Sequence, residues 1–165
     1  MKTLPSFCAL ILATMALALP ARAATVEVRY DSRQAHSDAG STVAEREKNL
    51  AAVAALLREL GARRLPASQT LEVELLDLDL TGTLRLSRRP VGEVRVVTGR
   101  ADGPRITLRY TLREGGATVR SGEESLYDAA LPRLGEARDS SGGEPLRHER
   151  TLLDHWFAQR FGAPQ

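Results

Sequence analysis

Hydrophobic and polar residues alternate along two stretches of the chain, residues 25–30 and 106–113. A period of two predicts β-strands with one buried face. In the second stretch the inward face would carry Ile106, Leu108, Tyr110 and Leu112. Two adjacent glycines follow at 115–116, and they predict a hairpin turn with a return strand from 118 towards 127.

The stretch from 71 to 80 has the composition of one long strand but changes phase halfway. Its first half would place Leu71, Val73 and Leu75 on one face, and its second half would place Leu76, Leu78 and Leu80 on the other. A β-bulge between Leu75 and Leu76 would bring both sets onto one core. We favour the bulge over a strand that passes from one covered face to another. Residues 84–86 and 93–98 are two further candidates for short strands.

Two segments have the period of an amphipathic helix. The first begins at a capping box, Thr42 with Glu45, and continues through Leu50, Val53, Leu57 and Leu60 to a glycine stop at Gly61. The second opens at Pro145, and its apolar face would carry Leu146, Leu153, Trp156, Phe157 and Phe161. The aromatic part of this face predicts core, with a partner-docking face as the alternative.

The order of these elements, β-α-β-β-β-β-α, predicts an α+β fold. An antiparallel sheet of about four to five strands would pack against the helix in the N-terminal half and against the C-terminal helix. Residues 24–165 would form one domain. The other sheet face would meet solvent and carry a row of arginines.

The first 23 residues have the three parts of a secretory signal peptide. Lys2 is followed by an apolar run over 7–19 and by a small-x-small exit, Ala21-Arg22-Ala23. We expect cleavage after Ala23, export to the periplasm (with extracellular release as the alternative), and no transmembrane segment afterwards. The one cysteine, Cys8, would leave with the signal, so the mature chain would have no disulfide and no thiol chemistry.

Removal of the signal also changes the charge. The whole chain has 23 Lys and Arg against 21 Asp and Glu, a net charge of +2. Lys2 and Arg22 would leave with the signal and no acidic residue would, so the mature chain would have 21 of each. A balanced charge gives no support to nucleic-acid binding. No cofactor motif stands out, and we expect no cofactor.

Three carboxylates are candidate ligands for a hard cation. Asp77 and Asp79 are two apart on a strand and would point the same way, and Asp128 could approach them across the sheet. The alternative is solvent-facing or turn-capping aspartates near Thr81. The three histidines, His36, His148 and His155, have wider spacing than usual for shared zinc ligation. Glu149 and Asp154 would form intrahelical or surface pairs.

The row Arg105, Arg109 and Arg113 is the most regular polar feature of the sequence. Residues four apart on a strand share a face, and arginine suits phosphate and carboxylate groups. The row is therefore a candidate site for an anionic ligand or an acidic partner. The alternative is a solvated face in which these arginines pair across strands with Glu123 and Glu124.

Several segments together resemble a known family. They are 65–71, Asp77-Leu78-Asp79-Leu80-Thr81-Gly82, 104–110, 122–128 and the tail Leu146 to Phe157. In order and spacing they resemble the secreted proteobacterial family called domain of unknown function 3016. The chain departs from the family pattern at Gly103, where the pattern has Trp, and at Ala129-Ala130. The resemblance implies export and a shared fold, and it implies no activity.

These observations leave three hypotheses. The first is a non-catalytic periplasmic binding or protein-interaction domain whose partner is an envelope protein or an anionic envelope component. The second is a metal-dependent hydrolase that uses Asp77, Asp79 and Asp128. The third is a structural protein whose sheet edge pairs with another chain.

Overall fold

The computed structural model describes residues 24–88, 91–128, 137–138 and 146–162. Along the chain its elements are β1 (Thr25–Arg29), α1 (Val43–Arg64), β2 (Gln69–Asp79), β3 (Thr83–Arg88), β4 (Val91–Val96), a short 3-10 helix (Arg100–Asp102), β5 (Arg105–Glu114), β6 (Ala117–Tyr127), β7 (Ala137–Arg138) and α2 (Arg147–Phe161). The predicted signal peptide with its cleavage site at Ala23 and the helix-opening Pro145 lie outside the described residues.

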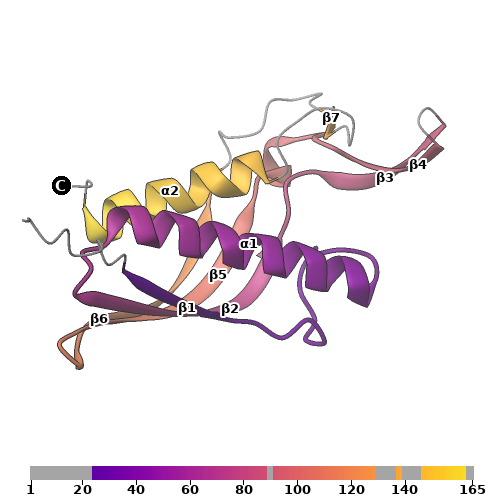
Figure 1. Ribbon diagram of the computed structural model, residues 1–165. Coiled ribbons are helices and arrows are strands. Elements are labelled where there is room, and N and C mark those ends of the chain that lie inside the picture. Colours follow the sequence, from indigo (N-terminus) through magenta and orange to yellow (C-terminus); the bar gives the residue numbers. More distant parts are fainter. Residues whose placement is uncertain (1–23, 89–90, 129–136, 139–145, 163–165) are drawn as a thin grey trace, which may run out of the picture.

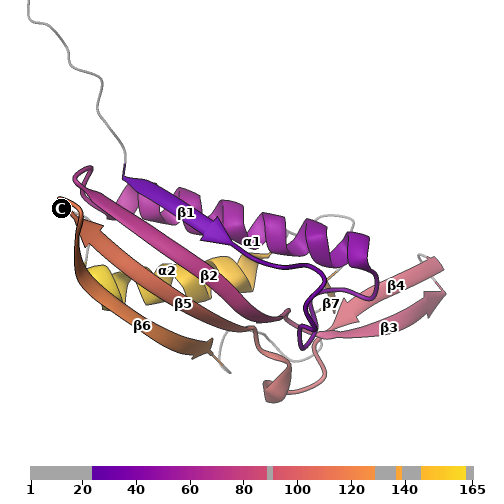
Figure 2. The same cartoon turned by 90° about the horizontal axis from the view of Figure 1, so that it is seen from below.

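A four-stranded sheet in the order β1-β2-β5-β6 forms the centre of the fold. Both helices lie on one face of this sheet, and the other face carries no helix (Figures 1 and 2). The predicted α+β fold is confirmed. The sheet is mixed rather than wholly antiparallel, because β1 pairs with β2 in parallel while β2, β5 and β6 are antiparallel. The reason is that α1 carries the chain back to the start of the sheet before β2 begins, and such a crossover gives parallel strands.

The predicted bulge in β2 is confirmed. The pairing of β2 with β5 shifts between Leu75 and Asp77, so that Leu76 has no opposite residue. Leu75 before the shift and Leu78 after it are both buried, at 1% and 0% exposure. One extra residue therefore keeps both halves of the strand on the same core.

The capping box of α1 is also confirmed. Thr42 Oγ1 accepts a hydrogen bond from the Glu45 backbone N–H at 3.2 Å, and Glu45 Oε2 accepts one from the Thr42 N–H at 3.2 Å. The predicted stop at Gly61 is wrong, since α1 continues to Arg64. Gly61 instead lies at a close contact: a Cβ there would be 2.4 Å from Val26 Cγ2 and 3.4 Å from Phe157 Cζ. Glycine lets the helix approach β1 and α2.

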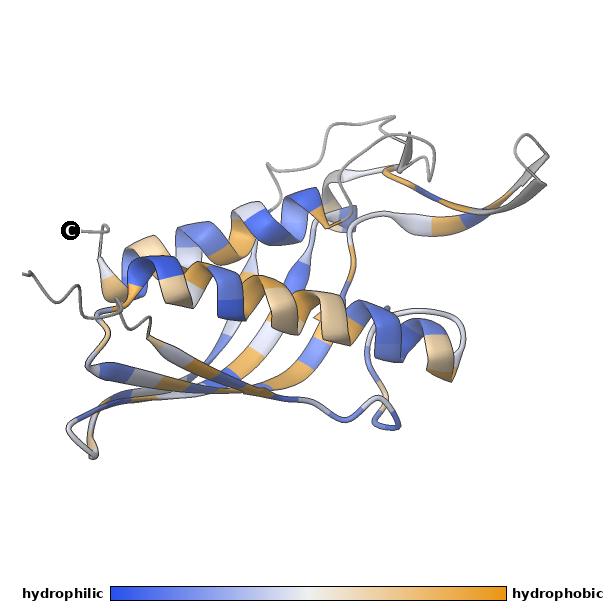
Figure 3. Ribbon diagram, in the orientation of Figure 1, coloured by the Kyte–Doolittle hydropathy of each residue, from blue (hydrophilic) through white to orange (hydrophobic). Residues whose placement is uncertain are grey.

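The core fills the space between the sheet and the helices. Hydrophobic and hydrophilic residues alternate in bands along both helices (Figure 3), as expected of helices with one buried side. Trp156 is 3% exposed and makes edge-to-face contacts with Tyr110, Phe157 and Phe161, with ring centroids 4.9–5.6 Å apart. The aromatic part of α2 is therefore core, as predicted, and β5 supplies part of its surroundings.

The two short strand candidates form a separate hairpin. β3 and β4 pair with each other, and β7 adds to β4 as the third strand of a small second sheet. The hairpin projects beyond the end of the main sheet (Figures 1 and 2), and Leu86 on it is 88% exposed. Among the described residues, no helix is long and apolar enough to cross a membrane.

Candidate functional site

The helix-free side of the main sheet, which we call the open face, carries the predicted arginine row. On β5 the core side holds Ile106, Leu108, Tyr110 and Leu112, all buried, so the intervening arginines and threonines lie on the open face. The strand register aligns one charged residue from each strand in a row across the sheet: Arg29, Glu74, Arg109 and Glu123. The signs of these charges alternate.

Arg109 lies between two glutamates. Its Nη1 donates to Glu74 Oε2 at 2.7 Å and its Nη2 donates to Glu123 Oε2 at 2.9 Å. The hydrogen bond to Glu123 and the negative charges of Glu123 and Glu74 raise the pKa of Arg109 above its ordinary value. All three side chains are about half exposed, so solvent screens these pairs and each adds little to stability.

The other two arginines of the row also have neighbours on the sheet. Arg113 Nε donates to Glu72 Oε1 at 2.9 Å. The Arg105 guanidinium lies over the ring of Tyr127, 4.8 Å from its centroid, in cation–π geometry. The predicted cross-strand pairing with Glu123 is confirmed. Glu124 instead points to the helix side, where Arg160 Nε lies 2.7 Å from its Oε1.

Charge on the open face is not net positive. The strand register places on it the arginines 29, 105, 109 and 113 and the glutamates 27, 72, 74 and 123. Asp77 and Asp79, at the end of β2, lie opposite Thr107 and Arg105, so six acidic residues share this face with four arginines. A polyanion would need a net positive surface, so this distribution of charge does not suit one.

A shallow depression of about 170 Å³ opens on this face. Its lining comes from β1, β2 and β5: Glu27, Arg29, Glu72, Val73, Glu74, Arg109, Tyr110 and Thr111. In the part of the chain that the structure describes, Glu27 and Arg29 make no ion pair, unlike the residues opposite them on β2. The depression therefore has one acid and one base available to an incoming group.

The carboxylates of the metal hypothesis lie at the end of β2, beside the loop that leads to α1. Asp77 accepts hydrogen bonds from the Ser37 N–H at 2.7 Å and from Ser37 Oγ at 2.6 Å. His36 Nδ1 lies 3.9 Å from Asp77 Oδ1. Asp77 thus holds this loop against the strand, which is a loop-capping role.

Asp79 is partly buried next to two other acids. Burial, and then the charges of Asp38 and Asp77, raise the pKa of Asp79 above its ordinary value. Asp128 lies farther away. In the strand register Asp79 lies opposite Arg105 of β5, and Arg105 lies opposite Tyr127 of β6, the residue before Asp128. The strand β5 therefore stands between Asp128 and Asp79, a separation of two strand spacings or about 10 Å.

No group of three or more His, Cys, Asp or Glu side chains is arranged to hold a metal ion within the described ranges. His36 contacts the Asp31 carbonyl oxygen through Nε2 at 3.1 Å, and His148 lies on α2 beside Arg147. His155 is exposed on the same helix. The role of Asp77, Asp79 and Asp128 as metal ligands stays a prediction.

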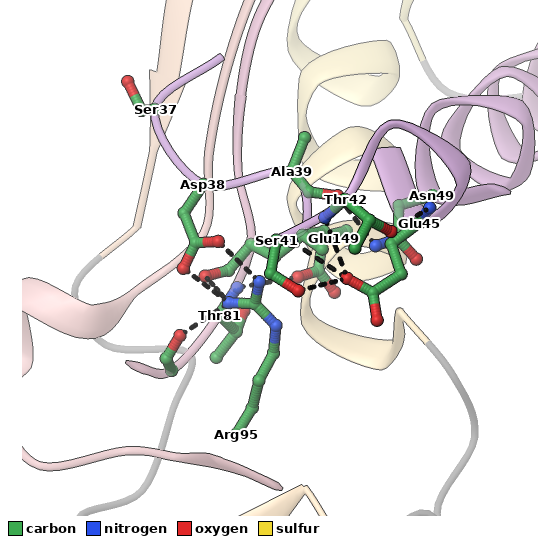
Figure 4. Close-up of polar contacts among 12 residues, drawn as sticks. Ser37, Asp38, Ala39, Ser41, Thr42, Glu45, Asn49, Thr81, Arg95 and Glu149 are labelled. Carbon is green, nitrogen blue, oxygen red and sulfur yellow. Dashed lines mark hydrogen bonds and ion pairs between the residues drawn. The ribbon is translucent and has the colours of Figure 1, made fainter. Parts of the chain in front are cut away.

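Two contacts that sequence reasoning missed, one partly buried and one fully buried, lie at the base of the β3–β4 hairpin (Figure 4). Arg95 forms a two-pronged ion pair with Asp38, Nη1 to Oδ2 at 2.8 Å and Nη2 to Oδ1 at 2.7 Å, and also donates to the Gly82 carbonyl at 2.8 Å. The segment around Asp38 runs beside the end of β2, so the pair joins it to β4. No spacing rule in the sequence links residues 57 positions apart.

Glu149 provides the second contact. Glu149, predicted to make an intrahelical or surface pair, does not lie on the surface: its side chain is fully buried, and its Oε1 accepts a hydrogen bond from the Thr81 N–H at 2.9 Å. Asp154, predicted in the same way, pairs with Arg64 of α1 at 2.6 Å, which is an interhelical contact. Thr81 sits in the β2–β3 connection, so Glu149 ties α2 to the point where the hairpin leaves the sheet.

Gly103, the departure from the family pattern, lies close to the backbone after β6. A Cβ at this position would lie 2.7 Å from the Asp128 carbonyl oxygen, closer than real contacts allow. A tryptophan in its place would require this segment to move. The glycine at position 103 thus allows the backbone at Asp128 to lie close to it.

Comparison with known proteins identifies the family. The chain matches the family described as "Protein of unknown function (DUF3016)" over residues 24–159, and it belongs to that family. No curated protein sequence matches it. A solved structure with some similarity is described as a "putative lipoprotein" from Caulobacter crescentus CB15; it shares 14% sequence identity, covers 81% of this chain and 80% of that chain, and has a TM-score of 0.28. A TM-score at this level supports no inference about fold or function.

Proposed function

We propose that this chain is an exported, non-catalytic interaction domain that binds a protein partner through the open face. The N-terminal 23 residues have the pattern of a secretory signal, which supports export to the periplasm, with extracellular release as the alternative. The partner would be a protein of the cell envelope.

The row Arg29, Glu74, Arg109 and Glu123 carries this proposal. Charges of alternating sign, held at fixed spacing on a rigid sheet, can be matched by a partner with the opposite alternation, which gives specificity and orientation rather than large affinity. The depression beside the row adds Glu27 and Arg29, which have no ion pairs of their own within the described residues. Arg105, Arg109 and Arg113 would then contact acidic residues of the partner.

In-cell photocrosslinking tests the proposal. A photoreactive residue at Thr107 or at Thr111 would project from the open face, and the same residue at Ala55, which is exposed on α1, provides the control. We expect one abundant protein to crosslink from both threonine positions and not from Ala55. The same set of products from all three positions, or none above background, would overturn the proposal.

Charge substitution gives an independent readout. Arg109→Gln removes the cation between Glu74 and Glu123 and should abolish the crosslink from Thr107 while the protein stays folded, because both ion pairs are exposed. Arg63→Gln on α1 makes the same change on the helix side and should have no effect. Equal crosslinking by both variants would show that the charged row is not the interface.

The metal-dependent hydrolase remains as the alternative. Addition of Mg²⁺ or Ca²⁺ to metal-free protein should raise its melting temperature if Asp77, Asp79 and Asp128 bind a cation, and Asp79→Asn should remove that shift. An unchanged melting temperature would exclude this function.

A further inference from the structure

The two edges of the main sheet differ in how they are protected. The β1 edge has five residues, and the Val28 carbonyl on it accepts a hydrogen bond from Arg58 Nη2 of α1 at 3.4 Å. The β6 edge has eleven residues, and no described strand pairs with its outer side. Figure 2 shows β6 along the outer margin of the sheet. An unpaired strand of this length is a template for another strand.

β6 lacks two of the features that usually prevent such pairing, because it contains neither proline nor lysine, although it carries Arg120, Glu123 and Glu124. It has one irregularity, a bulge at Val119, where the pairing with β5 shifts between Leu112 and Arg113. From Arg120 to Tyr127 the strand is regular. Val119 and Tyr127 are large hydrophobic residues that stay 52% and 41% exposed.

We propose that β6 pairs in antiparallel orientation with β6 of a second copy of this chain, about a two-fold axis at Gly122, which extends the sheet across both copies. Gly122 is the midpoint of Ala117–Tyr127, and an axis there pairs the regular stretch Arg120–Glu124 of one copy with the same stretch of the other. The residue on the axis lies opposite the same residue of the second copy, and glycine brings no side chain to that position. The same glycine leaves room for the Tyr110 ring, which lies 3.2 Å from where a Cβ would be.

The charges on β6 favour this register. A two-fold axis perpendicular to the sheet places residue 120 opposite residue 124 of the second copy, twice. Arg120 and Glu124 lie opposite Leu112 and Leu108 of β5, so both point to the helix side and would meet across the interface. An axis at Glu123 would instead place that glutamate opposite itself.

Arg120 is exposed and can accept such a partner. Its Nη1 donates to the Arg160 carbonyl, and within the described residues it has no carboxylate partner. Glu124 pairs with Arg160 at 2.7 Å and keeps 18% of its side chain exposed. In the dimer Glu124 would lie between Arg160 of its own chain and Arg120 of the second copy. The central stretch Arg120–Glu124 is regular on both strands, and the bulge at Val119 marks where the regular pairing ends.

Sedimentation equilibrium, on the protein as purified from cells that process it, tests the dimer. Wild type should dimerise at micromolar concentration, and a monomer at every concentration up to the millimolar range would overturn the proposal. Arg120→Glu turns both cross-interface pairs into Glu–Glu pairs, and Glu124→Arg turns both into Arg–Arg pairs. Each variant should raise the dimer dissociation constant by about tenfold or more.

A mixture separates the interface from a folding defect. The Arg120→Glu chain has glutamate at both positions and the Glu124→Arg chain has arginine at both, so one copy of each restores two attractive pairs. We expect the mixture to form heterodimers although neither variant dimerises alone. Glu123→Arg is the matched control, because it is the same substitution at a position that faces Ser121 of the second copy, and it should leave the dimer intact. Dimers that survive both single variants, or a mixture that stays monomeric, would exclude this register.

This inference stands apart from the proposed function. The crosslink from Thr107 reports the open face, and the dimer depends on the edge of β6. If the dimer is absent but the crosslink is present, the proposal of β6 pairing is wrong. If the crosslink is absent but the dimer is present, the proposed function of the open face is wrong.

Discussion

Substitution of Asp38 by asparagine should loosen the base of the β3–β4 hairpin by breaking its ion pair with Arg95. The Arg95 side chain is 11% exposed and that of Asp38 is 31% exposed, so the pair is neither deeply buried nor freely solvated. Both of its hydrogen bonds are short, at 2.7 and 2.8 Å, and both join charged groups. These features set the expected size of the effect.

The magnitude lies between two limits. Breaking a buried pair by removing one partner costs about 3–5 kcal/mol, and breaking an exposed pair costs about 0–1 kcal/mol. Arg95 keeps its hydrogen bond to the Gly82 carbonyl in the variant, and loss of the Asp38 charge also relieves Asp79, whose pKa that charge helps to raise. We therefore expect Asp38→Asn to lower the free energy of unfolding by about 2 kcal/mol.

A double-mutant cycle measures the pair itself. Urea unfolding followed by Trp156 fluorescence reports the whole core, because Trp156 is the single tryptophan of the chain and is 3% exposed. Arg95→Met keeps the aliphatic part of the side chain, and the double variant should lose about 1–2 kcal/mol less than the sum of the two single losses. Asp154→Asn, at a more exposed pair with Arg64, is the control and should cost less. Additive losses at Asp38 and Arg95, within about 0.5 kcal/mol, would refute the reasoning.

Three further predictions use the same unfolding assay. Phe157→Ala should cost about 3–5 kcal/mol, because this fully buried ring fills the contact between α1 and α2; a loss below about 1 kcal/mol would mean that the ring is not packed as described. Glu45→Ala should cost about 1 kcal/mol through loss of the capping box, and Glu47→Ala, two residues further on, should cost less. Asp79→Asn should stabilise the protein at pH 7. The pKa of Asp79 is raised in the folded state, so its contribution to stability is present below the unfolded pKa, near 3.9, and is lost as the pH rises through the folded pKa. Asparagine stays neutral and avoids this loss. The advantage of asparagine should shrink below about pH 4, and an advantage that is equal at pH 7 and pH 3.5 would contradict this origin.

Local pattern was sufficient for most of the elements. The alternation at Ile106, Leu108, Tyr110 and Leu112 predicted the buried side of β5, and the phase change after Leu75 predicted the bulge in β2. These predictions succeed because the period of side-chain direction belongs to the strand itself and needs no knowledge of its neighbours. The capping box of α1 is equally local, since both its residues lie within one turn.

Gly61 and Glu149 show where local reasoning failed. A glycine near the end of a helical pattern predicts a stop, yet α1 continues through Gly61, where the missing side chain leaves room for Val26 and Phe157. A glutamate in the first turn of a helix predicts a surface residue, yet Glu149 is buried, and its carboxylate accepts a hydrogen bond from the Thr81 N–H. In both cases the deciding contact comes from a distant part of the chain.

The candidate site divides in the same way. The sequence by itself determined that Arg105, Arg109 and Arg113 share one face of a strand and to which family the chain belongs. Only the tertiary structure decided which charges neutralise the arginines, because Glu74 and Glu72 reach Arg109 and Arg113 from β2, a strand distant in sequence, through the register between β2 and β5. It also left β6 at the edge of the sheet, since the order of strands follows from how the helices cover the core and not from any single strand's pattern.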